Sequence, residues 1–371
     1  MKVMTLVGTR PELIKLSRVI AELDARVRQV LVHTGQNFDY ELNQVFFEQL
    51  EIRKPNHFLD AAGENAAQTI GNVIAKADAV MAAEQPDALL LLGDTNSCLA
   101  AISAKRRKIP IFHMEAGNRC FDQRVPEEIN RRIVDHVSDI NLTYTEHARR
   151  YLLREGLAPE TVIKTGSPMK EVLEAYRSRI ERSRALEDLG VERGAFFLVS
   201  AHREENVDSQ GNFNDLLASL EALIADYGLP VIFSAHPRTC KRLDALKSKL
   251  AAQIRILKPL GFLDYVKLEL NARCVISDSG TITEESSILG FPAVTIRQAH
   301  ERPEGMDEGT LIMCGLKLEG VREAVATILA QHAEGRRSRL VPDYDVADVS
   351  SKVVRIILSY TEYINRTVWF K

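Results

Sequence analysis

The sequence predicts an α/β protein with two doubly wound, Rossmann-like domains that face a cleft. Three observations lead to this fold class. Short apolar runs alternate with longer amphipathic stretches, which is the pattern of parallel strands joined by crossover helices. The alternation occurs twice, and a charged helical stretch over 176–189 separates the two halves. Polar and ionisable residues gather directly after the apolar runs, where open α/β sheets bind ligands.

The apolar runs supply the expected strands, and helical periodicity fills the stretches between them. The expected strands are 3–7, 30–33, 88–92, 109–112 and 140–144 in the first half, and 196–200, 231–234, 254–257, 274–277 and 293–296 in the second. A final apolar stripe over 349–357 predicts a C-terminal helix, which in folds of this type often crosses back to the first domain. We expect an N-terminal domain of residues 1–168, with 355–371 packing back on it, and a C-terminal domain of residues 169–354.

Composition and charge narrow the class of protein. A chain of 371 residues is too long for one ordinary core, which favours two domains. The net charge of −3 offers no basic field for nucleic acid or an anionic membrane. No apolar run approaches the roughly 18 residues that span a bilayer, and the first residues do not resemble a signal peptide. Five scattered cysteines predict neither a disulfide framework nor a zinc site. We therefore expect a cytoplasmic protein that binds no nucleic acid, membrane or metal.

Five strand ends carry polar residues that could form a site. They are 8–15, 93–97, 113–117, 201–206 and 235–238. A single residue of this kind is usually a cap or a loop residue. Capping alone explains five such ends poorly, so we expect a functional site at the carboxyl ends of the strands.

The run 276–285, at the end of a further expected strand, is the most informative run in the chain. It predicts a buried strand, a tight turn and the start of a helix, whose unpaired N–H groups attract phosphate. Gly280 would let the backbone come close to an anion. Glu285, one turn further, could accept hydrogen bonds from ribose hydroxyls, so the run indicates a nucleotide site. The alternative is an ordinary helix cap, because Thr281 and Glu284 have capping-box spacing.

Candidate acid–base groups collect in the first half. Asp94 and Glu115 follow central strands, so their carboxylates should approach one another. Glu127 begins a helix, where it could serve as a catalyst or simply suit the helix dipole and pair with Arg131. Carboxylates with pKa values pushed apart can act as acid and base. His202 could donate to a leaving phosphate, with a purely structural histidine as the alternative.

Two further residues could contact a nucleotide. Arg10 lies on the turn after the first strand and could reach a diphosphate as a cation, or could be a surface charge at a helix start. Tyr265 could stack on a base, although plain packing explains it as well.

Eight short motifs occur in order along nearly the whole chain. They are Gly8-Thr9-Arg10-Pro11-Glu12, Gly93-Asp94-Thr95, Glu115-Ala116-Gly117, Pro126-Glu127-Glu128-x-Asn130-Arg131, His202-Arg203, Asp278-Ser279-Gly280, Glu284-Glu285 and Glu301-Arg302-Pro303-Glu304. Each is weak alone, but together they resemble the non-hydrolysing UDP-N-acetylglucosamine 2-epimerase family. The resemblance implies the architecture of two Rossmann-like domains that many glycosyltransferases share, called GT-B-like. It also implies a homodimer.

The resemblance implies an isomerase that inverts carbon 2 of a UDP-2-acetamido sugar by eliminating UDP to a 2-acetamidoglycal and adding it back. The implied catalytic residues are Asp94, Glu115, Glu127 and His202, the last assisting the departing diphosphate. The implied substrate-binding residues are Arg10, Lys15, Tyr265, Ser279, Gly280, Thr281, Glu285 and Arg302. No cofactor and no metal are implied.

Details of the motifs resemble a narrower branch of the family, UDP-N-acetyl-L-fucosamine synthase. They are the runs 117–128, 279–282 and 357–361, with Thr281 where familiar members of the family have glycine. That branch acts on UDP-2-acetamido-2,6-dideoxy-L-talose in capsule and O-antigen sugar supply. The alternatives are UDP-N-acetylglucosamine 2-epimerase itself, a relative acting on a diacetamido uronic acid, a glycosyltransferase, and a non-catalytic UDP-sugar-binding regulator. The intact set of carboxylates argues against the regulator.

Overall fold

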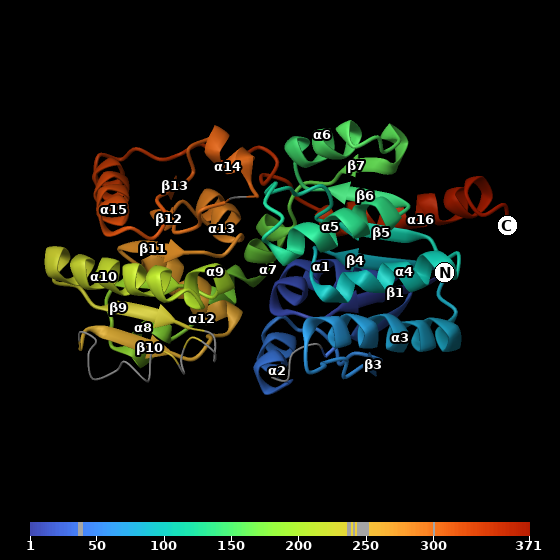
Figure 1. The fold of residues 1–371 in the computed structure, drawn as a ribbon, viewed down its shortest axis with the longest axis horizontal. Helices are drawn as coiled ribbons and strands as arrows, with labels where there is room; N and C mark the ends of the chain where they lie inside the picture. The colour runs from blue at the N-terminus through green and yellow to red at the C-terminus, as the bar shows by residue number, and fades with distance from the viewer. Residues whose placement is uncertain (36–39, 236–238, 240–241, 243–251, 300) are drawn as a thin grey trace. The chain divides into compact units, whose positions relative to one another are not determined.

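A computed structural model of the protein describes residues 1–371 except 36–39, 236–238, 240–241, 243–251 and 300. The chain forms two compact units (Figure 1). One contains Met1–Ala175 together with Pro342–Lys371, and the other contains Tyr176–Val341. Of the polar strand end expected at 235–238, only Ala235 lies among the described residues.

The first unit is built on a parallel sheet of seven strands in the order β3-β2-β1-β4-β5-β6-β7. The strands are β1 (Lys2–Val7), β2 (Arg28–His33), β3 (His57–Phe58), β4 (Ala88–Leu92), β5 (Ile111–Met114), β6 (Ile140–Thr143) and β7 (Val162–Lys164). The helices are α1 (Arg10–Arg26), α2 (Tyr40–Gln49), α3 (Ala66–Glu84), η1 (Asn96–Ala100), α4 (Ala101–Arg106), α5 (Pro126–Val137), α6 (Glu146–Arg154), η2 (Pro159–Thr161), α7 (Met169–Glu181) and α16 (Val349–Thr367).

The second unit repeats this plan with a six-stranded parallel sheet in the order β10-β9-β8-β11-β12-β13. The strands are β8 (Phe197–Ser200), β9 (Val231–Ser234), β10 (Ile254–Leu257), β11 (Cys274–Ser277), β12 (Ala293–Thr295) and β13 (Ile312–Met313). The helices are α8 (Ala185–Leu189), α9 (Glu204–Val207), α10 (Gln210–Tyr227), α12 (Phe262–Asn271), α13 (Ile282–Leu289), α14 (Pro303–Asp307) and α15 (Leu318–Ala333). Two parallel sheets with alternating helices confirm the predicted α/β class.

The structure corrects some of the expected strands. β3, β7 and β13 were not foreseen, because these edge strands of two or three residues contain no apolar run long enough to stand out. β5 begins at Ile111 rather than at residue 109, since Pro110 has no N–H to donate to a ladder. His113 therefore belongs to the strand and not to the loop that follows it.

Both sheets have a switch point, where the chain changes the direction in which it adds strands. In the first unit it lies between β1 and β4, and in the second between β8 and β11. Open α/β sheets bind ligands outside the carboxyl ends of the strands at such points. The residues that follow these four strands are therefore the first place to look for a site.

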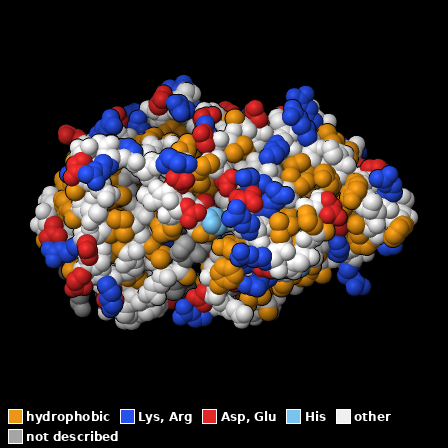
Figure 2. Space-filling view, turned by 90° about the horizontal axis from the view of Figure 1, so that it is seen from above, with side chains coloured by type: hydrophobic (Ala, Val, Ile, Leu, Met, Phe, Trp, Pro, Cys, Tyr) orange, Lys and Arg blue, Asp and Glu red, His pale blue; other side chains and the backbone are white. Residues whose placement is uncertain are grey.

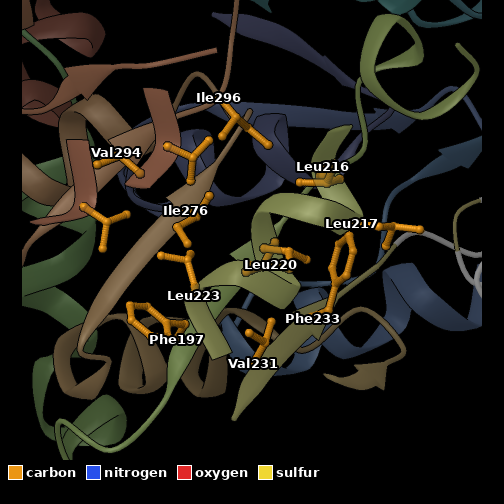
Figure 3. Close-up of a cluster of buried hydrophobic side chains, with 14 of the residues drawn as sticks. Phe197, Leu216, Leu217, Leu220, Leu223, Val231, Phe233, Ile276, Val294 and Ile296 are labelled. Atoms are coloured by element: carbon orange, nitrogen blue, oxygen red, sulfur yellow. The ribbon is translucent and has the colours of Figure 1, made fainter. Parts of the chain in front are cut away.

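Helix α10 supplies a large part of the core of the second unit. Its leucines, including Leu216, Leu220 and Leu223, pack on one face of the sheet against Phe197 and Ile276 (Figure 3). Neighbouring strand residues point the other way into a separate buried cluster with α12 and α8. Burial on both faces explains why these strands are uniformly apolar rather than alternating.

The C-terminal segment belongs to the first unit. Helix α16 packs against α1, and the loop before α16 also contacts the first unit. Ser167 N donates to Asp343 O at 3.1 Å, and Lys164 pairs with the Asp343 carboxylate at 2.8 Å. The units accordingly divide after Ala175 and before Pro342, rather than after residue 168 and before residue 355 as expected. The first boundary falls inside α7, a helix that the sequence pattern gives no reason to divide.

The described part of the surface is mixed in charge. On the face that Figure 2 draws, acidic and basic side chains are interspersed among hydrophobic ones, in keeping with the net charge of −3. Among the helices that the structure describes, none combines the length and the apolar character needed to cross a membrane.

Candidate active site

Lys15 and Glu115 form the central ion pair at the carboxyl ends of the strands in the first unit. Lys15 lies on α1, Glu115 follows β5, and Lys15 Nζ is 2.8 Å from Glu115 Oε2. The two side chains are only 3% and 12% exposed, so water screens their attraction weakly. Lys15 Nζ also lies 5.4 Å from the centre of the Tyr144 ring. The structure therefore brings together one expected binding residue and one expected catalytic residue.

The backbone at Glu115 is strained. Its φ of +63° is in the left-handed region, which is unfavourable for a residue that has a Cβ atom. Gly117, two residues later, has a φ of +82°, and a Cβ there would lie 2.5 Å from Ala148 O. Strain of this kind persists only where the surrounding structure holds it, and it concentrates at functional positions.

Asp94 lies at the end of β4, beside the switch point. Asp94 Oδ2 is 2.8 Å from a guanidinium nitrogen of Arg131, and Asn130 Nδ2 donates to the main-chain oxygen of Asp94 at 3.0 Å. Both partners come from α5, whose first turn also carries Glu127. Buried Glu128 accepts from Arg131 at 3.3 Å and from Cys120 N at 3.1 Å. Helix α5 thus joins Asp94 to the loop before Glu127.

Glu12 is a buried carboxyl group that we did not place in the site from sequence. Its Oε1 accepts from Thr95 Oγ1 at 2.5 Å, and its Oε2 accepts from the main-chain N–H groups of Gly8 and Thr9. It therefore joins the end of β1 to the end of β4. Burial raises the pKa of Glu12 to about 7, against the lowering effect of these hydrogen bonds, and the nearby charge of Asp94 raises it further. Its capping-box spacing from Thr9 was the signal that could have singled it out.

Arg10 opens α1 at the same end of the sheet. Its guanidinium lies over the ring of Phe46, 5.8 Å from the ring centre. Its expected role toward a diphosphate stays a prediction.

His202 and Asp278 form a pair at the switch point of the second unit. His202 Nδ1 is 3.0 Å from Asp278 Oδ1, and the imidazole is 45% exposed. The carboxylate also accepts from the main-chain N–H groups of His202 and Arg203 and from Asn206 Nδ2, at 3.0 to 3.1 Å. Burial alone would raise the pKa of Asp278, but the His202 charge and these hydrogen bonds lower it to about 2. Since Asp278 holds Nδ1, Nε2 is the ring nitrogen that can reach a ligand.

The turn after β11 contains three of the expected binding residues. Ser279 Oγ and Thr281 Oγ1 are 2.9 Å apart, and helix α13 begins directly afterwards. Thr281 makes no side-chain capping bond within the described residues, so the capping box that its spacing from Glu284 predicts does not form, and Thr281 N donates instead to Ser279 Oγ at 3.3 Å. Gly280 has no positive φ, and a Cβ there would lie 3.8 Å from its nearest neighbours. The fold of this turn therefore does not itself require glycine, and close approach to an anion stays a prediction.

Arg302 braces the same turn. It is 5% exposed, its Nε donates to Gly280 O at 3.0 Å, and its Nη2 is 3.2 Å from Glu284 Oε2. A cavity of about 20 Å³ beside Ser279, Gly280 and Arg302 has room for about one water molecule. The contacts of Arg302 support a role in shaping the turn.

Tyr265 and Glu285 lie close to one another in the second unit. Burial raises the pKa of the Tyr265 phenol, and the carboxyl groups of Glu269 and Glu285 raise it further. The Tyr265 ring packs against a hydrophobic cluster that includes Leu268, which agrees with the packing alternative. Glu285 is 7% exposed on the first turn of α13.

The structure groups the expected residues within each unit. The first unit holds Arg10, Lys15, Asp94 and Glu115 at or near the ends of β1, β4 and β5, and Glu127 on the first turn of α5. The second holds Tyr265, Ser279, Gly280, Thr281, Glu285, Arg302 and, beside Asp278, His202. Asp278 was named from sequence only within a motif, and Arg131 only within a motif and as a possible partner of Glu127, because nothing local in the sequence reveals the pairs with His202 and Asp94. Among the residues that the structure describes, no three His, Cys, Asp or Glu side chains group as metal ligands.

Comparison with known proteins gives consistent results. The family model for UDP-N-acetylglucosamine 2-epimerase matches residues 21–358. The UDP-N-acetylglucosamine 2-epimerase of Methanocaldococcus jannaschii is 36% identical over 340 residues, covering 89% of this chain and 92% of that protein. The UDP-2,3-diacetamido-2,3-dideoxy-D-glucuronate 2-epimerase of Pseudomonas aeruginosa is 33% identical over 338 residues, covering 89% of this chain and 93% of that protein.

Solved structures agree over the full length. A structure of UDP-N-acetylglucosamine 2-epimerase from Rickettsia bellii has a TM-score of 0.94 and 59% identity, covering 100% of both chains. The Methanocaldococcus jannaschii enzyme in complex with UDP-GlcNAc and UDP has a TM-score of 0.90 and 32% identity, covering 97% of this chain and 100% of that one.

Proposed function

Because this chain belongs to the UDP-N-acetylglucosamine 2-epimerase family, we propose that it inverts the configuration at carbon 2 of a UDP-2-acetamido sugar. It is an isomerase of the non-hydrolysing type. The single observation that best supports the proposal is the grouping of ionisable side chains, each held by a buried partner, at the carboxyl ends of the strands in both units. Glu115 is held by Lys15 at 2.8 Å, and His202 by Asp278 at 3.0 Å.

The chemistry of the substrate explains why such groups are needed. Carbon 2 of the sugar is not next to a carbonyl group, so its hydrogen is too weakly acidic to be removed and returned directly. Elimination solves this, because the C2–H bond and the C1–O bond to UDP break together and leave a 2-acetamidoglycal. UDP then adds back to carbon 1 as carbon 2 receives a proton on the opposite face. The reaction needs an acid–base group on each face and stabilisation of the leaving diphosphate.

The first unit supplies the acid–base groups in this proposal. Glu115, Asp94 and Glu127 exchange the proton at carbon 2, and one of them must be protonated when another is ionised. Lys15 keeps a positive charge beside Glu115, which favours the ionised carboxylate of a base. Arg131 has the same effect on Asp94 at 2.8 Å.

The second unit supplies the groups that hold UDP. The Ser279 and Thr281 hydroxyls and the start of α13 can donate hydrogen bonds to phosphate oxygens. His202 Nε2 can donate to the departing diphosphate, since Asp278 Oδ1 lies 3.0 Å from Nδ1 and leaves Nε2 to face a ligand. Glu285 can accept from the ribose hydroxyls, and Tyr265 can contact the base. Arg10, from the first unit, adds a cation for the diphosphate.

The favoured substrate is UDP-2-acetamido-2,6-dideoxy-L-talose, with UDP-N-acetyl-L-fucosamine as the product for capsule or O-antigen synthesis. Support comes from Thr281 in the phosphate turn and from the run 117–128. UDP-N-acetylglucosamine is the second candidate, because the solved Rickettsia bellii relative that is 59% identical is named for it. We also propose that the protein is a cytoplasmic homodimer. Light scattering of the purified protein tests the dimer by measuring its mass in solution.

Deuterium exchange distinguishes these substrates. The protein is incubated in deuterated water with each candidate UDP-sugar, and deuterium at carbon 2 is followed by NMR. Label that appears only in the 6-deoxy-L-talose sugar supports the favoured substrate, while label in the glucosamine sugar assigns the second candidate. A protein that binds UDP but labels no sugar would be a regulator, and the proposed function would be wrong.

A further inference from the structure

A buried group of charged side chains lies beneath the turn that carries Glu115. His113 on β5, Asp135 on α5 and Arg119 in the following loop all have fully buried side chains. His113 Nδ1 is 2.9 Å from Asp135 Oδ1, and an Arg119 guanidinium nitrogen is 2.7 Å from Asp135 Oδ2. Arg119 also makes a two-point contact with Glu155, at 2.8 and 2.7 Å. None of these residues has a part in the reaction described above.

This group connects the two strand ends that carry the expected acid–base residues. His113 Nε2 is 2.7 Å from Gly93 O, the residue immediately before Asp94. Since a carbonyl oxygen only accepts, Nε2 must donate to it. The Asp135 carboxylate accepts from Gly117 N at 3.2 Å, two residues after Glu115. The end of β4 and both sides of Glu115 are therefore linked through one carboxylate.

The charge balance explains why the linkage should be rigid. Nε2 donates to Gly93 O and Nδ1 lies 2.9 Å from an Asp135 carboxylate oxygen, an arrangement that favours the protonated imidazole of His113. Burial opposes this charge, but Asp135 and the Gly93 carbonyl outweigh burial and raise the pKa of His113. Two cations, His113 and Arg119, then face two anions, Asp135 and Glu155. Removing one member of such a group leaves an uncompensated buried charge.

The strain at Glu115 needs a restraint of this kind. A left-handed φ of +63° at a residue with a side chain persists only where its neighbours over-determine it. His113, two residues earlier, and Gly117, two residues later, are both bound to Asp135.

We propose that His113 and Asp135 are positioning residues that fix the Asp94 and Glu115 carboxylates relative to one another without touching the substrate. The proposal rests on the proposed function for its link to turnover. The proposed restraint lies entirely in the first unit, so changing it should leave the UDP-binding groups of the second unit unaffected.

The test compares two buried aspartates that contact opposite ends of β5. Asp135→Asn keeps the shape of the side chain but cannot accept on both positions that His113 and Arg119 occupy. Asp139→Asn is the matched control, because Asp139 is also buried and charged but binds Lys105 at 2.6 Å and Ile111 N at 2.9 Å, at the start of the strand. Both changes should destabilise the first unit. Only Asp135→Asn should disturb Glu115.

Two measurements decide the outcome. In Asp135→Asn, turnover in the carbon-2 exchange assay should fall by about 10- to 100-fold, the scale of a misplaced catalytic group, while KM and UDP affinity stay within about threefold. The Gly117 amide should exchange its hydrogen at least about 10-fold faster, because it loses a buried acceptor. In Asp139→Asn, turnover and Gly117 exchange should both stay within about threefold of the wild type.

Contrary results would be clear. If Asp135→Asn is folded and its turnover and Gly117 exchange match those of Asp139→Asn, the positioning role is wrong. If the wild type labels no sugar but Gly117 exchange still rises only in Asp135→Asn, the restraint is real and the proposed function fails. Should Asp135→Asn not fold, His113→Gln is judged by the same criteria, because glutamine can still donate to Gly93 O but loses the charge that faces Asp135.

Discussion

Glu12 is a buried carboxyl group whose ionisation should weaken the fold, and Glu12→Gln tests this directly. Glutamine has nearly the same shape. Its amide oxygen can accept from Gly8 N and Thr9 N, as Glu12 Oε2 does. Its NH₂ group can donate to Thr95 Oγ1, where the carboxylate accepts at 2.5 Å. The substitution therefore removes the titration while keeping the hydrogen bonds.

The expected effect follows from proton linkage. Burial raises the pKa of Glu12 from 4.5 in an exposed chain to about 7, so the folded protein keeps a proton that the unfolded chain has lost. The resulting stabilisation is fully present below pH 4.5 and is lost as the pH rises through about 7. A difference of this size corresponds to about 3 kcal/mol of unfolding free energy between pH 4.5 and 8. Glu12→Gln should lack this loss.

The comparison must be made against the wild type, because another buried group acts in the opposite direction. Burial lowers the pKa of His33 from 6.5 to about 4. Its contribution to stability is present above pH 6.5 and is lost as the pH falls through about 4. The two slopes oppose each other between pH 4.5 and 6.5, so the wild-type curve should be nearly flat there. Subtracting it from the Glu12→Gln curve cancels His33 and leaves Glu12.

The assay is urea unfolding at a series of pH values, followed by tryptophan fluorescence. Trp369 is the single tryptophan, and it belongs to the unit that contains Glu12. Its signal therefore reports that unit rather than an average over two. Relative to the wild type, Glu12→Gln should gain about 3 kcal/mol in unfolding free energy from pH 4.5 to pH 8. A difference that is constant within about 0.5 kcal/mol would refute the reasoning.

Three further outcomes are expected. Gly117→Ala should cost about 1–3 kcal/mol more in unfolding free energy than Gly156→Ala. Both glycines have a positive φ, but only at Gly117 would an added Cβ lie 2.5 Å from a carbonyl oxygen. Equal losses of unfolding free energy in urea titrations would show that this close approach has no energetic effect. In the wild type, the low pKa of Asp278 contributes about 2 kcal/mol of unfolding free energy, which is present above pH 3.8 and lost as the pH falls through about 2. Asp278→Asn should remove this contribution, and unfolding followed by circular dichroism at pH 2 to 5 measures it. An unchanged dependence of stability on pH in this range would argue against the pair with His202. Asp94→Asn and His202→Ala should each lower turnover at least about 100-fold in the carbon-2 exchange assay, and rates like those of the wild type in either would remove that residue from the mechanism.

Most of the strands and helices could be predicted from the sequence, because they depend on local patterns of apolar and polar residues. β4 was predicted with its correct ends, since Ala88–Leu92 is an unbroken apolar run before a glycine. The capping-box spacing of Thr9 and Glu12 stands at the start of α1 and could have singled out Glu12, but it was not used. The edge strands β3, β7 and β13 were missed because two or three residues give no period to detect.

From the sequence, the site residues could be predicted only as ionisable or polar residues that follow strands. Which of them pair with one another could not be predicted. Lys15 and Glu115 are 100 residues apart in the chain, and His202 and Asp278 are 76 apart. What joins them is the order of strands in each sheet, with β1, β4 and β5 side by side in the first and β8 beside β11 in the second. Apolar periodicity determines that a segment forms a strand, but it is nearly silent on which strand lies beside it, because all these strands are buried alike on both faces. Only the folded sheet decides which charges meet, and so which carboxylates lie beside a cation.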